Sequence, residues 1–318
     1  MRDVRHLLAC PACRGELSAY RTCVACGSRF DAPEGIPNLR LSADSQTEMV
    51  RTFYDAAPFP GYPARDSLWT FRLRAERSRF AQLLDRAVPV DARIAEIGCG
   101  TGQMSLCLSR ADRTIIAADL SRSALHLRAA AARSFGIGNV HFVETDLHRP
   151  ALKASAFDVV FSSGVLHHTP NPRAAFAKVA ALARSGGVVI VGVYNAVARL
   201  PHRLRRSIAR ATHFRVVPFD SVLHERSHEP GRREAWLHDQ YQHPVEHSHT
   251  IAEVKRWFSD NEVDYLRSFP SQVLDDESED LFAPAIDDWS IERWIAQAGW
   301  IWSLGGEGGL FFIIGARR

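Results

Sequence analysis

Glycines at alternate positions mark the part of this chain best suited to hold a ligand. Gly98, Gly100 and Gly102 follow a short apolar run that contains Glu96, and a helical pattern begins directly after them. Glycine allows the backbone to turn sharply and allows a ligand to lie directly against it. The helix that follows presents free N–H groups and the positive end of its dipole. The spacing therefore predicts a strand, a loop and a helix that together hold a nucleotide.

The residue at position 103 narrows the type of nucleotide. The dinucleotide fingerprint G-x-G-x-x-G needs a third glycine there, and Gln103 occupies the position. Glu96, at the expected end of the strand, suits a ligand with a cationic, amine-bearing tail better than a pyrophosphate. The segment resembles motif I of the class I S-adenosylmethionine (SAM) methyltransferases, for which E-x-G-x-G-x-G is typical.

Later segments extend this resemblance. Residues 115–118 read as a second strand ending at Asp119, which lies 21 residues after Gly98, where such folds place a carboxylate on the ribose hydroxyls. A third strand, 140–143, leads to Asp146, an acid that in the family usually holds the adenine amino group. A fourth strand, 157–161, runs into a segment similar to the family's FDxVxSxxVLHH pattern.

The resemblance covers roughly residues 90–195 and implies SAM as the cofactor of a methyl-transferring enzyme. One departure is Ser185, which stands where the family usually has proline before two glycines. Taken alone, the glycine loop is often a tight turn, and either acid could be a helix cap. Four motifs in the right order favour the methyltransferase interpretation. The cofactor-binding residues that it implies are Glu96, Gly98, Cys99, Gly100, Gly102, Asp119, Leu120, Asp146, Leu147, Ser162, Ser163 and Gly164.

Four cysteines near the N-terminus form a second motif. Cys10 and Cys13 make one C-x-x-C knuckle, and Cys23 and Cys26 make another after nine intervening residues. Four thiolates at this spacing can surround one tetrahedral Zn²⁺ and leave no open position for water, which predicts a structural zinc ribbon. A redox pair or two disulfides is the alternative, but no signal peptide precedes the knuckles and we expect a cytoplasmic protein. A ribbon before a SAM domain loosely resembles the zinc-ribbon rRNA guanine methyltransferases, and also bacterial methyltransferases with a short fused ribbon.

Composition sets further limits. The chain has 318 residues, of which 46% are hydrophobic, enough for one large α/β domain with additions. A net charge of +3 argues against a large nucleic-acid footprint, and no DNA partner is expected. No apolar run approaches the roughly 18 residues that span a bilayer, so we expect no membrane partner.

The order of the expected elements predicts an α/β fold with a seven-stranded, doubly wound, mostly parallel sheet. Residues 263–269 and 309–316 read as the last two strands, which in this family form a reversed hairpin. Residues 72–84 read as one amphipathic helix, and the aromatic, proline-rich stretch 53–62 is either a structural strap or a lid. The expected domains are a zinc ribbon (1–40), a helical lid or linker (41–90), a SAM-binding core (91–195), a cap insertion (196–249) and a C-terminal part (250–318) with an insertion at 271–306.

The cap insertion holds two clusters that invite a functional interpretation. Helical spacing would align Arg199, Arg203, Arg206 and Arg210 on one face, which could bind RNA phosphates or an anionic metabolite. The alternative is a solvated face that pairs with local acids. Residues 240–249 hold three histidines and a glutamate, which could bind a second metal but suit a polar cleft lining better.

The acceptor of the methyl group is open at this stage. A general base is needed only if the nucleophile must lose a proton. The candidates are His167, His168, Tyr54, Tyr194, Tyr241 and His243, and Asn195 is placed to orient an acceptor. Three functions remain: a methyltransferase for a small metabolite or natural-product intermediate, which we favour; an RNA methyltransferase that uses the ribbon and the arginine cluster; and a SAM-binding partner protein without turnover. The oligomeric state is not predicted.

Overall fold

The computed structural model describes residues 3–18, 22–41, 45–56, 67–100, 103–110, 112–225, 230–243, 245–273, 276, 278–285, 290–304 and 309–318. The described residues contain nine strands and three short 3₁₀-helical turns, in addition to the helices described below. The strands are β1 (Leu17–Ser18), β2 (Thr22–Cys23), β3 (Arg93–Ile97), β4 (Thr114–Asp119), β5 (Val140–Glu144), β6 (Phe157–Ser163), β7 (Ala183–Tyr194), β8 (Val263–Phe269) and β9 (Leu310–Arg317). The turns are the 3₁₀ helices η1 (Arg5–Leu7), η2 (Pro33–Gly35) and η3 (Leu166–His168).

The central sheet has seven strands in the order β5-β4-β3-β6-β7-β9-β8. The first five are parallel, whereas β9 runs antiparallel to both β7 and β8. From β3 the sheet is extended by β4 and β5 on one side and by β6 and β7 on the other, so the strand order reverses between β3 and β6. In α/β sheets, ligands bind at the carboxyl ends of the strands at such a switch point. The predicted fold class is confirmed, including the reversed terminal hairpin.

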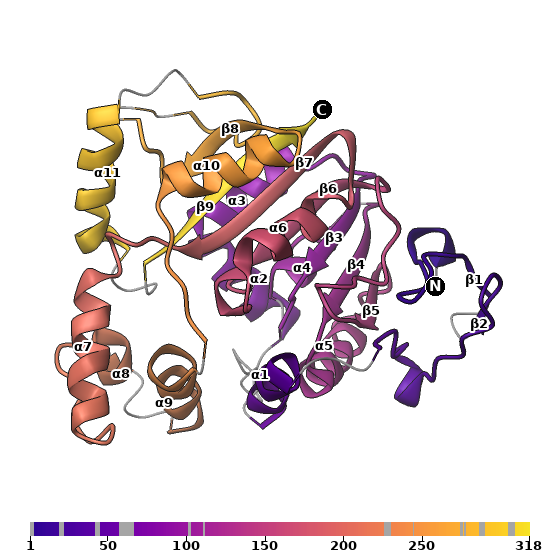
Figure 1. The fold of residues 1–318 in the computed structure, drawn as a ribbon, viewed down its shortest axis with the longest axis horizontal. Coiled ribbons are helices and arrows are strands. Elements are labelled where there is room, and N and C mark those ends of the chain that lie inside the picture. Colours follow the sequence, from indigo (N-terminus) through magenta and orange to yellow (C-terminus); the bar gives the residue numbers. More distant parts are fainter. Residues whose placement is uncertain are drawn as a thin grey trace.

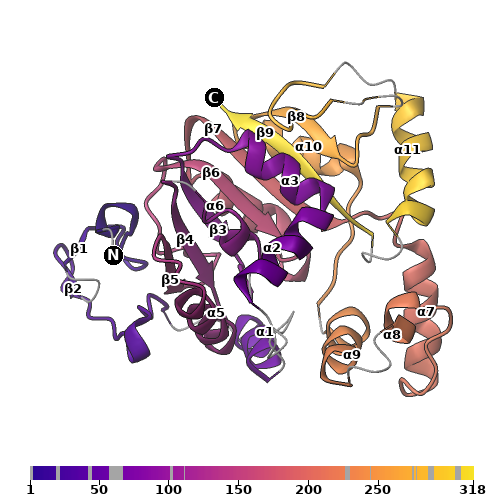
Figure 2. The same cartoon turned by 180° about the vertical axis from the view of Figure 1, so that it is seen from behind.

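Helices cover both faces of the sheet (Figures 1 and 2). On one face, α6 (Pro172–Ala180) and α10 (Ile251–Asp260) place Phe176 and Phe258 against the strands. On the other face, α3 (Arg79–Ala87) and α5 (Arg122–Ser134) contribute Leu84 and Leu125 to a second core. The short α4 (Gln103–Cys107) follows the glycine loop. The strands are apolar on both sides because both sides are covered.

The predicted single helix at 72–84 is wrong in one respect, because the chain forms two helices there. These are α2 (Leu68–Arg77) and α3, and the break falls at Ser78. The Ser78 hydroxyl accepts a hydrogen bond from the Ala81 N–H and so caps α3, while Ser67 and Thr70 form a capping box at the start of α2. Serine favours such caps because its hydroxyl satisfies an N–H that the helix leaves free.

The N-terminal segment docks on the edge of the sheet. Residues 37–39 run parallel to β5, where the Leu39 N–H donates to the Glu144 carbonyl over 2.8 Å. The Ala9 N–H donates to the Ala151 carbonyl over 3.0 Å, and Leu8 pairs with Leu152. The β5 edge is therefore covered by chain from the ribbon region, which satisfies backbone groups that would otherwise be exposed.

A group of helices, here called the cap, lies at the end of the molecule away from the N-terminal segment (Figure 1). It consists of α7 (Leu200–Ala211), α8 (Ser221–Glu225), α9 (Pro230–Leu237) and η4 (His238–Gln242), a π-helical turn. Its small core joins Ala209, Leu223, Trp236 and Tyr241. Two further helices are α1 (Ser45–Ala56), which precedes the sheet, and α11 (Ser290–Ser303), which precedes β9. No helix within the described ranges has both the length and the apolarity needed to span a bilayer.

Candidate functional site

The glycine loop has the backbone shape that its sequence predicts. Gly98 has a φ of +69°, and its N–H donates to the Ala118 carbonyl over 2.8 Å. A Cβ at this position would lie 2.2 Å from a methyl carbon of Val165, so no other residue fits without moving the chain. Gly100 also has a positive φ, +51°. Positive φ is strained for residues with a side chain, so the turn depends on glycine.

Asp119 closes the loop from the end of β4. One carboxylate oxygen accepts from the Gly100 N–H over 2.5 Å, and the other accepts from the Ser121 N–H over 2.7 Å. Burial raises the pKa of Asp119, while these two N–H groups act in the opposite direction. The carboxylate therefore fixes the glycine loop and still faces the cavity described next.

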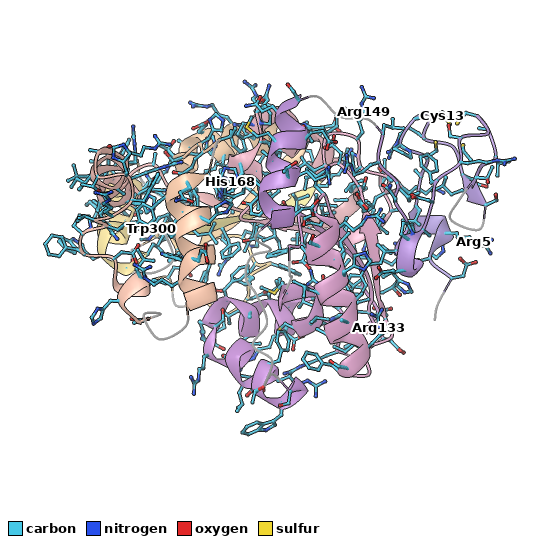
Figure 3. All side chains as sticks on the ribbon, turned by 90° about the horizontal axis from the view of Figure 1, so that it is seen from below. Arg5, Cys13, Arg133, Arg149, His168 and Trp300 are labelled. Atoms are coloured by element: carbon cyan, nitrogen blue, oxygen red, sulfur yellow. The ribbon has the colours of Figure 1, made fainter. Side chains whose placement is uncertain are left out.

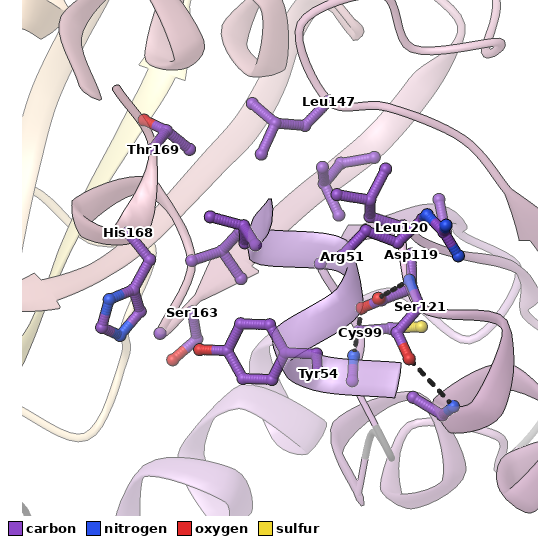
Figure 4. Close-up of a pocket in the computed structure, with 18 of the residues that line it drawn as sticks. Arg51, Tyr54, Cys99, Asp119, Leu120, Ser121, Leu147, Ser163, His168 and Thr169 are labelled. Atoms are coloured by element: carbon purple, nitrogen blue, oxygen red, sulfur yellow. Dashed lines mark hydrogen bonds between the residues drawn. The ribbon is translucent and has the colours of Figure 1, made fainter. Parts of the chain in front are cut away.

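One cavity of about 340 Å³ extends from the glycine loop to the cap. Twelve of the predicted site residues line it: Gly98, Cys99, Gly100, Asp119, Leu120, Asp146, Leu147, Ser163, Gly164, His168, Tyr54 and Tyr194. Figure 4 shows His168 at one end and Asp119 at the other, with Tyr54 between them. The cavity thus joins the expected nucleoside side to the expected reaction side.

Five predicted residues do not line this cavity: Glu96, Ser162, His167, Tyr241 and His243. Glu96 is buried beneath the loop, where one oxygen accepts from the Ser105 N–H over 3.0 Å and lies 3.3 Å from the Arg128 guanidinium. Arg128 is itself buried and donates to the Cys99 carbonyl over 3.0 Å. Glu96 therefore holds the loop through Arg128. Gly102, a sixth predicted residue, lies outside the described residues.

His168 has one ring nitrogen committed to the backbone. Its Nδ1 lies 2.9 Å from the Val245 carbonyl oxygen. A carbonyl can only accept, so Nδ1 carries the hydrogen and Nε2 is left as the atom that can take up a proton. Burial lowers the pKa of His168 to about 4, so the ring is neutral near pH 7. In Figure 3 the side chain lies near the middle of the molecule.

Two of the other histidine candidates pack against residues that line the cavity. The His243 ring lies 3.8 Å from the His168 ring, and the His167 ring lies 3.8 Å from the Tyr194 ring. Burial lowers the pKa of His167 well below the usual value for histidine. Tyr241 points into the cap core and donates to Asp220 over 2.5 Å. These contacts place His167 and His243 behind the cavity lining, whereas Tyr241 belongs to the core of the cap.

Two parts of the lining carry no sequence motif. Thr47, Val50 and Arg51 come from α1, and Trp236 and Gln240 come from the cap. The Gln240 amide donates to the Tyr194 hydroxyl over 2.7 Å, which links the cap to the end of β7. In the sequence, these segments contain aromatic residues but no strand pattern. That feature indicates that a segment could approach the site, but it does not identify which side chain lines the cavity.

The arginine cluster is divided between the interior and the surface. Arg199 is buried, pairs with Glu246 over 2.9 Å and lies 3.5 Å above the centre of the Tyr194 ring. Arg206 pairs with the same carboxylate over 2.8 Å. Arg203 and Arg210 are exposed. Half of the predicted basic face is therefore committed to a buried ion pair and is not available to phosphate.

The four N-terminal cysteines meet at one point. Their sulfur atoms lie within 4.8 Å of one another, with 3.8 Å between Cys10 and Cys26 and 3.4 Å between Cys13 and Cys23. A zinc ion with Zn–S bonds of about 2.3 Å would hold its ligands roughly 3.8 Å apart. All six cysteines of the chain are free thiols. Among the described residues, no other group of histidine, cysteine or acidic side chains has such an arrangement, including residues 240–249.

Comparison with known proteins identifies the core. The model of a family described as "Methyltransferase domain" matches residues 95–191, the segment that holds the glycine loop and β3 to β7. Residues 95–191 are therefore similar to a methyltransferase domain. The finding confirms the predicted resemblance and the predicted kind of enzyme domain.

Several individual proteins are similar to this chain. An uncharacterized protein of Synechococcus is 27% identical over 70% of this chain and 60% of its own length. A ubiquinone biosynthesis O-methyltransferase of Xanthomonas axonopodis is 26% identical over 48% of this chain and 63% of its own length. The chain therefore spans less than two thirds of these relatives. A crystal structure of magnesium protoporphyrin IX methyltransferase from Synechocystis with bound SAM superposes with a TM-score of 0.49 and 14% identity, over 87% of this chain and 100% of that one.

Proposed function

We propose that this protein transfers the methyl group of SAM to a small acceptor that is enclosed between the sheet, α1 and the cap. The observation that carries the proposal is one continuous cavity lined by the glycine loop, Asp119 and Asp146 on one side and by His168 and Tyr54 on the other. When bound, SAM supplies an electrophilic methyl group on its sulfonium. The relative that is named as an O-methyltransferase supports the same kind of reaction.

The chemistry of the residues on the nucleoside side of the cavity supports SAM as the ligand. Gly98 packs against Val165 with no space for a Cβ, which fixes the turn of a loop that lines the cavity. Asp119 would accept hydrogen bonds from the ribose hydroxyls, and Asp146, with Leu120 and Leu147 beside it, would hold the adenine. Ser163 and Gly164, at the end of β6, would lie along the amino-acid tail.

The reaction side fits an acceptor that must lose a proton, such as a hydroxyl. His168 is neutral, and its Nε2 would take the proton as the acceptor oxygen forms its bond to the methyl carbon and the carbon–sulfur bond breaks. Val245 fixes the tautomer that makes this possible. Tyr54 and Tyr194 would position the acceptor and help to exclude water.

The cysteine cluster would bind Zn²⁺ in a structural role. Four thiolates complete a tetrahedral shell, so no position remains for a reacting water. The β1–β2 hairpin contains two residues in each strand and buries little surface on its own. A metal would stabilise a segment too small to fold around a core of its own.

The alternative functions are less well supported. For an RNA methyltransferase, a positive stripe should lead to the cavity, but among the described lining residues Arg51 is the one arginine, and it pairs with Glu48 and Asp55. For a partner protein without turnover, the cavity should be lined by the cofactor loops alone, but its lining also includes His168, Trp236 and Gln240. Both alternatives remain outcomes of the test.

The test is incubation with SAM labelled on its methyl group, together with a panel of small phenols and catechols, and separately with total tRNA and rRNA. We expect label in a small acceptor and none in RNA. In H168N the asparagine amide still donates to Val245, but no proton acceptor remains, so turnover should fall roughly 100-fold or more while SAM binding is kept. Label in RNA would favour the second function. Cofactor binding without label in any acceptor would favour the third.

A further inference from the structure

The outer face of α7 exposes an apolar stripe. Leu200, Leu204 and Ile208 are spaced four residues apart and are 51%, 66% and 37% exposed. Directly after the helix, Val216 is 50% and Phe219 is 97% exposed. The opposite side of α7 packs inward through His202 and Ala209. We call the five exposed residues the α7 face. Such a stripe is larger than the single exposed apolar residues that are common on protein surfaces.

The chain around the α7 face is strongly basic. It contains six arginines and no acidic residue between Tyr194 and Asp220. Arg203, Arg210 and Arg215 are exposed, whereas Arg199 and Arg206 are held inside by Glu246. An apolar stripe flanked by arginines is typical of a helix that lies in the interface of a bilayer.

A second apolar stripe lies on α11. Ile291, Trp294, Ile295 and Trp302 are between 53% and 88% exposed, while Ala296, Gln297 and Trp300 face inward. The two helices occupy the same end of the molecule in both views, opposite the N-terminal cysteines (Figures 1 and 2). Tryptophan is enriched at membrane interfaces, because its ring is apolar and its N–H can remain hydrated.

We propose that the α7 face, together with the exposed tryptophans of α11 at the same end of the molecule, binds the surface of a membrane that contains anionic lipids. The leucines and Phe219 would enter the acyl boundary, and Arg203, Arg210 and Arg215 would lie among the lipid phosphates. A second copy of this chain is a poorer partner, because two α7 faces would bring exposed arginines together without acids to pair them. The inference concerns the bilayer surface and does not depend on methyl transfer. It revises our expectation of no membrane partner, which rested on the lack of a spanning run.

The experiment is co-sedimentation of the full chain with vesicles of phosphatidylcholine alone and of phosphatidylcholine mixed with phosphatidylglycerol. We expect binding to the anionic vesicles that weakens as salt is raised. The L204S/I208S variant tests the stripe, and V90S/L127S is its control, because Val90 and Leu127 are 67% and 45% exposed elsewhere on the molecule. Binding should be lost in the first variant and kept in the second.

The R203Q/R210Q variant tests the charges. It should weaken binding to anionic vesicles about 30-fold at low salt, whereas R77Q/R133Q, with the same change in net charge on other exposed arginines, should not. The proposal is overturned if the wild-type chain binds neither kind of vesicle. It is also overturned if sedimentation velocity shows a dimer that L204S/I208S dissociates, since the stripe would then be covered by a second copy. Both readouts are independent of catalysis.

Discussion

At the scale of single residues, the tautomer of His168 decides what the cavity can do. The Val245 carbonyl keeps a hydrogen on Nδ1, and burial keeps the ring neutral by lowering its pKa to about 4. A neutral imidazole with a defined acceptor nitrogen can remove a proton from a hydroxyl, whereas a protonated ring cannot.

We therefore predict an unusual pH dependence of turnover. The active form of His168 is the neutral one, which predominates above its pKa. The rate limited by this base should stay level from pH 8 to about pH 5 and fall only as the pH approaches 4. An ordinary imidazole would lose activity near pH 6.5. The measurement is kcat against pH with a saturating acceptor. A decline centred near pH 6.5 would contradict the assignment, and H168N should remove this pH dependence along with most of the rate.

Many of the predicted residues that line the cavity lie on the parallel strands and their loops. Gly98, Asp119 and Asp146 follow strand ends, and the carboxyl ends of parallel strands meet at one edge. Glu96 and Ser162 are also on strands, but both are buried and neither lines the cavity. A one-residue difference along a strand reverses the direction of a side chain, and a motif does not specify which direction faces a ligand.

At the scale of elements, the N-terminal ribbon is joined to the loop that follows Asp146. The Arg14 guanidinium donates to the Pro150 and Leu152 carbonyls, and the Ala9 N–H donates to Ala151. The same loop is tied internally, because the Thr145 hydroxyl accepts from the Ala151 N–H over 2.9 Å. A change in the ribbon should therefore reach the adenine end of the cavity.

We predict that removal of the metal from the cysteine cluster weakens cofactor binding. Chelation should lower the affinity for S-adenosylhomocysteine several-fold, and zinc added back should restore it. R14M should weaken binding to a similar extent while zinc content stays near one equivalent, because it breaks the contact to the loop and leaves the thiolates intact. R5M is the control, since Arg5 is exposed and pairs with Asp3. Unchanged affinity after both treatments would show that the ribbon does not support the loop.

Sequence patterns predicted the strands well and the cap poorly. Residues 263–269 were expected as a strand and form β8 with the same bounds. The parallel strand β4 is apolar from Ile115 to Ala118 and buried on both sides, which leaves few alternative structures for such a run. The cap folds around four apolar residues and several buried polar contacts, such as the hydrogen bond from Tyr241 to Asp220. Such contacts join residues that are far apart in the chain, so they produce no regular spacing of apolar residues from which the structure could be predicted.

At the scale of the whole molecule, a buried ion pair fastens the cap. Glu246, near the end of the cap segment, pairs with Arg199 and Arg206 at its start. Burial acts to raise the pKa of Glu246, but the two arginines lower it to about 2. The pair closes the segment between β7 and α10 and holds Tyr194 beneath the Arg199 guanidinium.

We predict that E246Q destabilises the protein by about 3 to 5 kcal/mol at pH 7, because it leaves two arginines without their buried partner. The lowered pKa of Glu246 means that its contribution is present above about pH 4.5 and is lost as the pH falls toward 2. The difference between wild type and E246Q should therefore shrink below pH 4. The measurement is urea unfolding at pH 7 and at pH 3.

The control for this experiment is E279Q, which removes an exposed carboxylate paired with Arg79 and Arg86. Exposed pairs contribute little, so E279Q should unfold close to the wild-type midpoint at both pH values. A loss of stability in E246Q no greater than that in E279Q would show that the buried pair does not fasten the cap.

The most direct test of the central claim is calorimetric titration of S-adenosylhomocysteine into the wild-type chain and two glycine variants. We predict one site with micromolar affinity in the wild type. G98A should abolish binding, because its Cβ would lie 2.2 Å from a Val165 methyl carbon at a φ of +69°. G138A should bind normally, because a Cβ at Gly138 meets nothing within 4 Å. A wild-type chain that takes up no nucleoside, or a G98A variant that binds as well as G138A, would contradict the assignment of this cavity to SAM.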